Sequence, residues 1–238
     1  MNGAWSRARR RALQGVALAA LGTAAWLVAP ALLRHVAFFR VRQIELVGVR
    51  NLAPEVVLAA LRLPAGASVF SDTRLLADRV RGVPGVAEAR VVRRLPATLQ
   101  LELREVEPAA LVPGPRGAGL VAVDAAGRPL PFDPARVGLD LPIATSADSG
   151  LVGVLALIQA VDPALFHSIT GARPWAHRDV LLEIGPRRVL LGRDAGPEVI
   201  RAVVLVAQDL TATGRAFGEL DARFGGQVVV RRKPSAGA

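Results

Sequence analysis

The chain has 238 residues, a formal net charge of +10 and no cysteine. This length allows one or two domains with cores of ordinary size, and the missing cysteines exclude disulfides, thiolate metal ligands and a thiol nucleophile. Residues 1–44 contain seven arginines and no acid, which accounts for most of the net charge. Aromatic residues are only 4% of the chain and alternate with no basic stretch, so we expect no nucleic-acid partner.

Residues 12–33, ALQGVALAALGTAAWLVAPALL, form an uncharged apolar segment. A helix of this length, at about 1.5 Å per residue, matches a hydrocarbon core of about 30 Å, so the segment predicts a transmembrane helix. Because basic clusters stay on the cytoplasmic side, residues 1–11 are expected to be a cytoplasmic tail and the later domains to be extracytoplasmic. A cleaved signal peptide and a buried soluble helix are the alternatives. The residues expected to set this topology are Arg7, Arg9, Arg10 and Arg11.

Residues 38–108 predict a compact domain with the element order β-α-α-β-β. Leu99, Leu101 and Leu103 alternate with polar residues, which is typical of a strand with one buried face. Asp72 precedes an apolar periodic segment and is expected to cap a helix. Two helices on one face of a three-stranded sheet would bury the apolar side chains of all five elements. The predicted elements are strand 41–49, helices 52–63 and 73–83, and strands 86–94 and 98–107.

Residues 109–119, AALVPGPRGAG, are rich in proline and glycine and predict a hinge between two domains. Residues 120–233 predict a second, β-rich domain. Its residues 197–212 repeat apolar side chains at the i, i+3, i+4, i+7 spacing of a long amphipathic helix. The other predicted elements are a buried helix at 151–161, hairpins at 120–124/128–130, 180–184/188–191 and 219–224/227–232, and a disordered tail at 234–238.

Three stretches follow the basic N-terminus and the apolar segment in a specific order: FFRVRQIELVGVRNLAPEVVLAAL, VPGVAEARVVRRLPATLQLELREVEPAAL and ELDARFGGQVVVRRK. Together they resemble the FtsQ/DivIB family of bacterial division proteins over nearly the whole chain. The resemblance implies an α+β fold with a single N-terminal transmembrane helix, a POTRA domain and the family's C-terminal β domain. One departure is Phe224, where family members usually carry tyrosine.

The same resemblance implies a single-pass protein of the cytoplasmic (inner) membrane at the division septum. Its extracytoplasmic domains would bind FtsB- and FtsL-type partners, connect to the septal synthase complex and support septal cell-wall synthesis. The alternative function is that of a POTRA-bearing transport or outer-membrane assembly component, which binds its substrate by strand addition.

The sequence contains none of the motifs for nucleotide binding, zinc proteases or serine nucleophiles. Its histidines, His35, His167 and His177, do not have the spacing of metal ligands. We therefore expect no enzymatic activity, and accordingly no catalytic residue, cofactor, metal or small-molecule substrate. Asp221 and Arg223 alternate in a predicted strand, which favours a salt bridge or a partner contact over acid–base catalysis.

The last predicted strand suits recognition by strand addition, because free N–H and C=O groups at a sheet edge can pair with an incoming chain. The alternative is an internal strand or a protected edge, on which Arg231, Arg232 and Lys233 oppose aggregation. The family resemblance favours partner binding, with Arg223 and Phe224 as the side chains that select the partner. The candidate partner-binding residues are Arg223, Phe224, Gly225, Gly226, Gln227, Val228, Val229, Val230 and Arg231.

Overall fold

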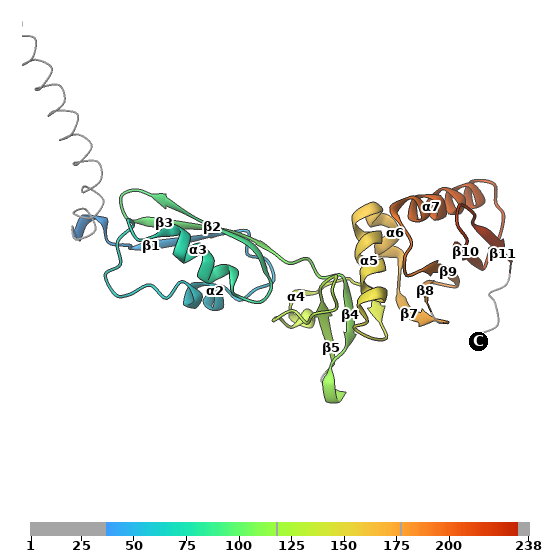
Figure 1. Ribbon diagram of the computed structural model, residues 1–238, viewed down its shortest axis with the longest axis horizontal. Coiled ribbons are helices and arrows are strands. Elements are labelled where there is room, and N and C mark those ends of the chain that lie inside the picture. The colour runs from blue at the N-terminus through green and yellow to red at the C-terminus, as the bar shows by residue number, and fades with distance from the viewer. Residues whose placement is uncertain (1–36, 118, 177, 233–238) are drawn as a thin grey trace, which may run out of the picture. The chain divides into compact units, whose positions relative to one another are not determined.

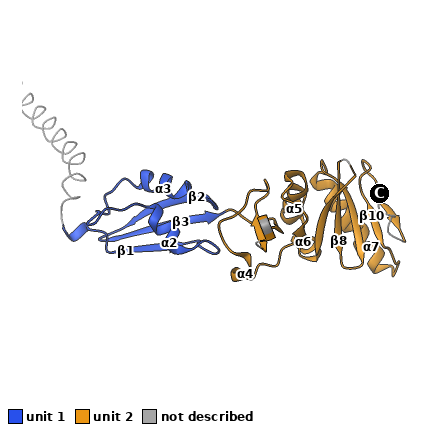
Figure 2. Ribbon diagram, turned by 90° about the horizontal axis from the view of Figure 1, so that it is seen from below, with its two compact units in different colours: residues 1–105 blue, residues 106–238 orange. Residues whose placement is uncertain are grey.

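The computed structural model describes residues 37–117, 119–176 and 178–232 (Figure 1). Contacts divide the chain into two compact units on either side of the Glu105–Val106 peptide bond (Figure 2). The predicted transmembrane helix, the basic tail before it and the predicted disordered tail lie outside the described residues. Within the part of the chain that the structure describes, no helix is long and apolar enough to cross a membrane.

The first unit has the predicted order β-α-α-β-β. Its three strands form a sheet in the order β1-β3-β2, in which β1 runs parallel to β3 and β2 runs antiparallel to it. The elements are η1 (Ala37–Phe39), β1 (Gln43–Val47), α2 (Pro54–Ala60), α3 (Thr73–Arg81), β2 (Val86–Arg94) and β3 (Thr98–Glu105).

Local chemistry explains these elements. The alternating leucines of β3, Leu99, Leu101 and Leu103, are all buried, as predicted. The side chain of Asp72 caps α3, because its Oδ1 accepts hydrogen bonds from the amides of Arg74 (2.9 Å) and Leu75 (3.3 Å). Both sequence signals are therefore confirmed in the structure.

Several predicted elements of the first unit are too long. Strand β1 ends at Val47 rather than at residue 49, because Gly48 has a φ of +88° and approaches β3 closely. A Cβ atom at this glycine would lie 2.0 Å from the carbonyl oxygen of Leu103. Helix α2 ends at Ala60, and Arg62 shortly after it has a φ of +46°. Strand β3 ends at Glu105, where its side chain binds the loop after β1.

The second unit is an eight-stranded mixed sheet in the order β11-β10-β9-β8-β7-β6-β4-β5. Helices α5 and α7 pack on one face, and the largest buried hydrophobic cluster lies between them and the sheet. The strands are β4 (Ala110–Pro113), β5 (Leu120–Val123), β6 (Ile143–Ala144), β7 (Gly171–Trp175), β8 (Asp179–Ile184), β9 (Arg187–Gly192), β10 (Glu219–Asp221) and β11 (Val229–Arg231). The helices are η2 (Pro115–Gly117), α4 (Pro134–Val137), α5 (Ser149–Val161), α6 (Pro163–Ser168) and α7 (Pro197–Ala212).

The predicted hinge at 109–119 is wrong in its first half. Ala110–Pro113 form strand β4, which pairs antiparallel with β5 and parallel with β6. Strand β5 therefore takes β4 as its main partner, and the predicted return strand at 128–130 contributes only an isolated bridge between Val123 and Pro129. The second unit accordingly begins before residue 120, at Val106. Helix α7 and the hairpin of β8 and β9 agree closely with the sequence prediction.

Candidate partner-binding edge

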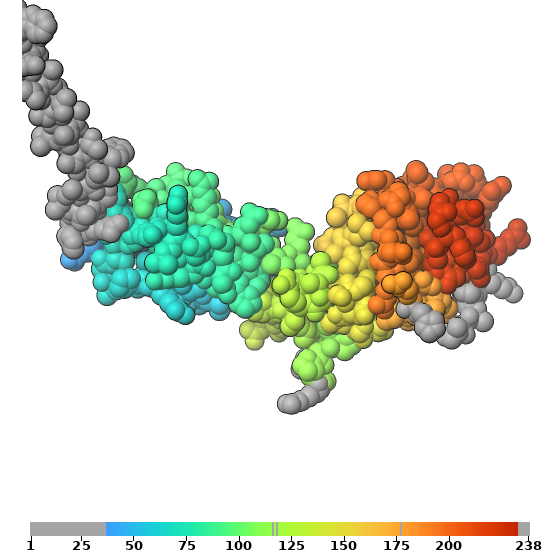
Figure 3. Space-filling model, viewed as in Figure 1, coloured from blue at the N-terminus to red at the C-terminus, as the bar shows by residue number. Residues whose placement is uncertain are grey.

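Strand β11 is at the edge of the eight-stranded sheet. It pairs antiparallel with β10, and no other described strand lies on its outer side. In the space-filling view the C-terminal segment, drawn in red, is at the surface of the second unit (Figure 3). An edge strand presents unpaired backbone donors and acceptors, which is the arrangement that strand addition requires.

The connection between β10 and β11 contains a tight turn at residues 224–227. The amide of Gln227 donates a hydrogen bond of 3.1 Å to the carbonyl oxygen of Phe224. Gly226 occupies the third position of this turn with a φ of +73°, whereas Gly225 has no left-handed conformation. A positive φ at this position is typical of a type II turn and favours glycine. The predicted turn at these two glycines is therefore confirmed, although both flanking strands are shorter than predicted.

The hydrogen bonds of β10 show which of its residues face β11. The amide of Ala222 donates a hydrogen bond to β9 (2.9 Å), and the carbonyl oxygen of Gly218 accepts one from β9 (2.9 Å). Gly218 lies just before β10, and its amide instead donates to the carbonyl oxygen of Arg231 in β11 (2.9 Å). Because alternate residues of a strand direct their backbone groups to the same side, Leu220 also faces β9. The intervening Glu219 and Asp221 therefore direct their N–H and C=O groups toward β11.

This alternation determines which backbone groups of β11 are available. Glu219 lies opposite Arg231, and Asp221 lies opposite Val229. These two pairs are consequently the hydrogen-bonded pairs of the antiparallel ladder, whereas Val230 lies between them in a non-hydrogen-bonded position. The N–H and C=O of Val230 point away from β10, toward the open side of the sheet edge.

The side chains of β10 divide between the two faces of the sheet. Leu220 and Ala222 belong to the hydrophobic core under the helices. Glu219 and Asp221 alternate with them and lie on the face away from this core, yet both carboxylates are fully buried. Burying a charge without a partner is costly, so both acids require cations nearby.

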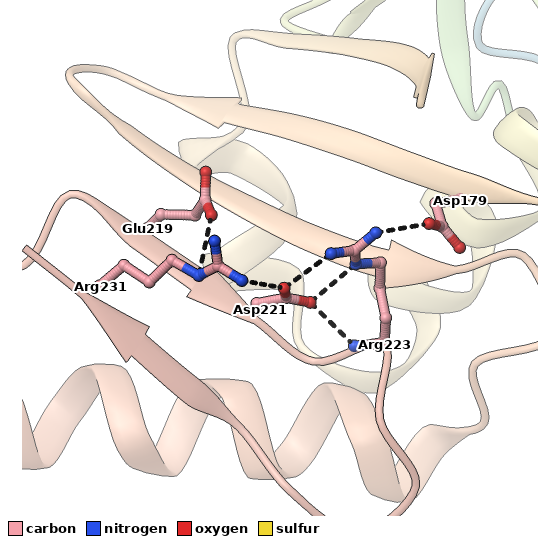
Figure 4. A network of polar contacts seen from close by, with 5 residues as sticks. All are labelled: Asp179, Glu219, Asp221, Arg223 and Arg231. Atoms are coloured by element: carbon pink, nitrogen blue, oxygen red, sulfur yellow. Dashed lines mark hydrogen bonds and ion pairs between the residues drawn. The ribbon is translucent and has the colours of Figure 1, made fainter. Parts of the chain in front are cut away.

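Two arginines supply these cations (Figure 4). The guanidinium of Arg223 donates from Nε to Asp221 Oδ1 and from Nη2 to Asp221 Oδ2, both at 2.8 Å. Its Nη1 donates to Asp179 Oδ2 at 2.8 Å. Arg231 donates from Nη2 to Asp221 Oδ2 at 3.2 Å, and its Nε lies 3.6 Å from Glu219 Oε1. We call these five residues the edge network.

The edge network shifts the pKa values of Asp221 and Arg223. The hydrogen bonds from Arg223 lower the pKa of Asp221 below its ordinary value, although burial of the carboxyl acts in the opposite direction. The same hydrogen bonds from Asp221 and Asp179 raise the pKa of Arg223. Asp221 and Arg223 are therefore ionised at neutral pH. The contacts of the edge network tie β8, β10, the turn and β11 together.

The structure separates five of the nine predicted partner-binding residues into two groups. Phe224, Val229 and Val230 have exposed side chains, with relative exposures of 51%, 37% and 42%. Arg223 and Arg231 instead contact buried carboxylates of the same unit, so their guanidinium groups are already engaged. The predicted salt bridge between Asp221 and Arg223 is confirmed.

Two members of the edge network, Asp179 and Glu219, were not predicted. Asp179 lies 44 residues from Arg223 in the sequence, and nothing local indicates that the two meet. Glu219 could have been noticed, because Glu219, Asp221 and Arg223 form an i, i+2, i+4 row of charges in a predicted strand. Within the described residues, no three carboxylate, histidine or cysteine side chains gather as they would around a metal ion.

Comparison with known proteins agrees with this architecture. Residues 39–105 match the family of POTRA domains of the FtsQ type. The cell division protein FtsQ of Rhodothermus marinus is 29% identical over 251 aligned residues, which cover 96% of this chain and 89% of that relative. The cell division protein FtsQ of an Anaeromyxobacter species is 36% identical over 152 residues, which cover 60% of this chain and 48% of that relative. The FtsQ protein of Mycobacteroides abscessus is 29% identical over 181 residues, 74% of this chain and 57% of that relative. The resemblance to the FtsQ/DivIB family is confirmed.

Proposed function

Because residues 39–105 match POTRA domains of the FtsQ type and the chain is similar over nearly its whole length to a cell division protein FtsQ, we propose that it is an FtsQ-type, single-pass membrane scaffold of the bacterial division complex. Its apolar segment at 12–33 anchors it in the cytoplasmic membrane, and the arginines before this segment keep the N-terminus in the cytoplasm. Both described units are then extracytoplasmic and act at the septum by recognition, without turning over a substrate.

The partners are FtsB- and FtsL-type proteins, and one of them adds a strand to β11. The single observation that supports this proposal is the free edge of β11, at which Val230 directs its N–H and C=O away from the sheet. An extended partner segment would gain main-chain hydrogen bonds there, which supply affinity irrespective of its sequence. Through these partners the scaffold connects to the septal cell-wall synthase.

Side chains beside this edge give selectivity. Phe224 is half exposed in the turn, and the guanidinium carbon of Arg223 lies 5.8 Å from the centre of its ring. Val229 and Val230 are exposed on opposite faces of β11. One would contact side chains of an added strand on one face of the sheet, and the other on the opposite face. Arg223 acts mainly through the edge network, because its donors are occupied by Asp221 and Asp179.

The test is a single proline substitution in β11 of the full-length protein. Val230→Pro removes an outward-facing N–H and is compatible with an edge strand, so the fold should persist while partner binding is lost. Val230→Thr keeps the N–H and the β-branched shape and serves as the matched control. Each variant is purified from membranes with its bound proteins, which are identified by mass spectrometry, and its folding is checked by circular dichroism.

We expect FtsB- and FtsL-type proteins to co-purify with the parent chain and the threonine variant, but not with Val230→Pro. Retention by a folded Val230→Pro would contradict strand addition at β11. Recovery of unfolded export substrates in place of division proteins would contradict the scaffold and favour a transport role. Val229→Pro is not an equivalent test, because the N–H of Val229 faces β10 and its loss would weaken the sheet itself.

A further inference from the structure

We propose that one end of the first unit docks on the surface of the lipid bilayer, through anionic phospholipid headgroups. The surface, which we call the N-terminal rim, consists of residues 37–43, 64–73 and 93–98. This inference depends on the membrane anchoring proposed above, and it assigns to the POTRA domain a lipid contact in addition to its place in the scaffold.

Backbone contacts bring the three segments of the N-terminal rim together. The amide of Val41 donates to the carbonyl oxygen of Ala67 (2.8 Å), and the amide of Val69 donates to that of Phe39 (2.9 Å). The amide of Arg42 donates to the carbonyl oxygen of Ala97 (2.8 Å). The loop before α3 and the turn between β2 and β3 therefore lie beside the point at which the described chain begins.

The N-terminal rim is basic. Arg40, Arg42, Arg93 and Arg94 lie in it, and Asp72 is its single carboxylate. Within the described residues none of these four arginines forms a salt bridge, in contrast to Arg81 and Arg104 of the same unit. Arg93 donates to the backbone carbonyls of Val69 and Ser71, so it holds two rim segments together and keeps its charge uncompensated.

The N-terminal rim also exposes large apolar side chains. Phe38 is 56% exposed and Leu95 is 63% exposed, although hydrophobic residues of this size are usually buried. Phe39 stacks edge-on with both Phe38 (ring centroids 5.2 Å) and Phe70 (5.1 Å), which fixes the aromatic group on the fold. Arginines together with exposed phenylalanine and leucine are typical of protein surfaces that bind at a bilayer interface.

Chain length keeps this surface close to the membrane. The predicted span ends at residue 33, and the described chain begins at Ala37, four residues later. Even a fully extended connection of this length reaches only about 14 Å. The basic and apolar side chains of the rim are therefore held near the headgroup layer, where anionic phosphates attract arginine.

The experiment uses single cysteines, because the chain has none of its own. Leu95→Cys is the informative variant. Leu95 is 57 residues from Phe38 in the sequence, so it lies in the rim only because the unit is folded. Val56→Cys is the matched control: Val56 is an exposed apolar residue of the same unit, 51% exposed. It lies in α2, whose preceding loop contacts Glu105 at the opposite end of β3. The full-length variants carry an environment-sensitive fluorophore and are reconstituted in phosphatidylcholine vesicles with or without phosphatidylglycerol.

We expect a nitroxide lipid labelled near the headgroup to quench the probe at position 95 about threefold more than the probe at position 56, in phosphatidylglycerol vesicles only. Adding Arg42→Gln and Arg94→Gln should reduce this quenching to the level in pure phosphatidylcholine. Equal quenching at both positions in a chain that resists alkaline extraction would overturn lipid docking and leave the anchor intact. A chain that alkaline extraction removes from the vesicles would overturn the anchor and the docking together.

Discussion

Arg223 and Asp221 face each other in a two-point contact, with Nε–Oδ1 and Nη2–Oδ2 distances of 2.8 Å. This geometry matches the planar guanidinium to the planar carboxylate and gives a strong, directional ion pair. Because Asp221 is fully buried while Arg223 keeps part of its side chain in water, the pair neutralises a carboxylate that β10 cannot expose.

We predict that Arg223→Met destabilises the second unit by about 1–3 kcal/mol, because it leaves Asp221 buried with Arg231 as its remaining cation among the described residues. Urea unfolding of the detergent-solubilised chain, followed by circular dichroism, measures this change. Arg215→Met, an exposed arginine without a salt bridge in the described part of the chain, is the control and should change stability by less than about 0.5 kcal/mol. An equal effect of both substitutions would contradict the importance of the pair.

The lowered pKa of Asp221 predicts that the stability of the second unit depends on pH. A carboxyl whose pKa is lower in the folded state stabilises the fold above its ordinary pKa of 3.8. This contribution is lost as the pH falls from there through the folded value. The free energy of unfolding should therefore fall more steeply between about pH 5 and pH 2 in the parent chain than in Asp221→Asn. The difference between the two curves isolates Asp221 from the other carboxyls, and parallel curves would refute the prediction.

We predict that Glu105 stabilises the first unit. Its carboxylate accepts hydrogen bonds from the amides of Arg50 (2.8 Å), Asn51 (2.9 Å) and Leu52 (3.1 Å) and so fixes the loop between β1 and α2. Glu105→Ala leaves these donors without their acceptor and should cost about 1–3 kcal/mol. Hydrogen exchange of residues 50–52, read by mass spectrometry, should become faster. Glu107→Ala, two residues further along and exposed, should leave their exchange unchanged.

The two glycines of the last turn should respond differently to substitution. An added Cβ meets no atom within 4 Å at either position, so only backbone conformation distinguishes them. Gly226→Ala places alanine at a φ of +73° and should cost about 1 kcal/mol, whereas Gly225→Ala should be nearly neutral. Urea unfolding of the two variants measures the difference. If the positions proved equally tolerant, the turn would not have the geometry described.

The sequence predicts individual elements better than their pairing. Strand β2 and helix α7 occupy the predicted residues, since period-two and 3.6-residue patterns are local signals. The parallel pairing of β1 with β3 has no local signal, because it joins segments more than fifty residues apart. Strand β4 was mistaken for a hinge because Pro113, Gly114 and Pro115 follow its apolar residues directly. Strand β7 was missed because it contains both glycine and proline.

The sequence predicts the last strand and its turn, but not the contacts that its arginines make. The final strand and its turn follow from the run of valines and from the two glycines before it. The inward orientation of Arg231 and Arg223 does not, because it depends on two carboxylates that become buried only when β10 pairs on both sides. Whether a charged side chain is buried depends on how distant strands pair. In the sequence, the alternating charges of residues 219–223 look like the solvent-exposed face of an ordinary strand.

The burial of Glu219 and Asp221 also constrains how β11 aligns with β10. A slip of one residue would exchange the two faces of β11. Arg231 would then lie on the hydrophobic-core side, and Val230 would lie over the two acids, which would lose a cation. Misaligned pairings are therefore penalised, because the buried carboxylates of Glu219 and Asp221 would lose the cation that Arg231 supplies. The edge thus has a single favoured alignment, so the partner strand that we propose would meet backbone donors and acceptors whose spacing is already set.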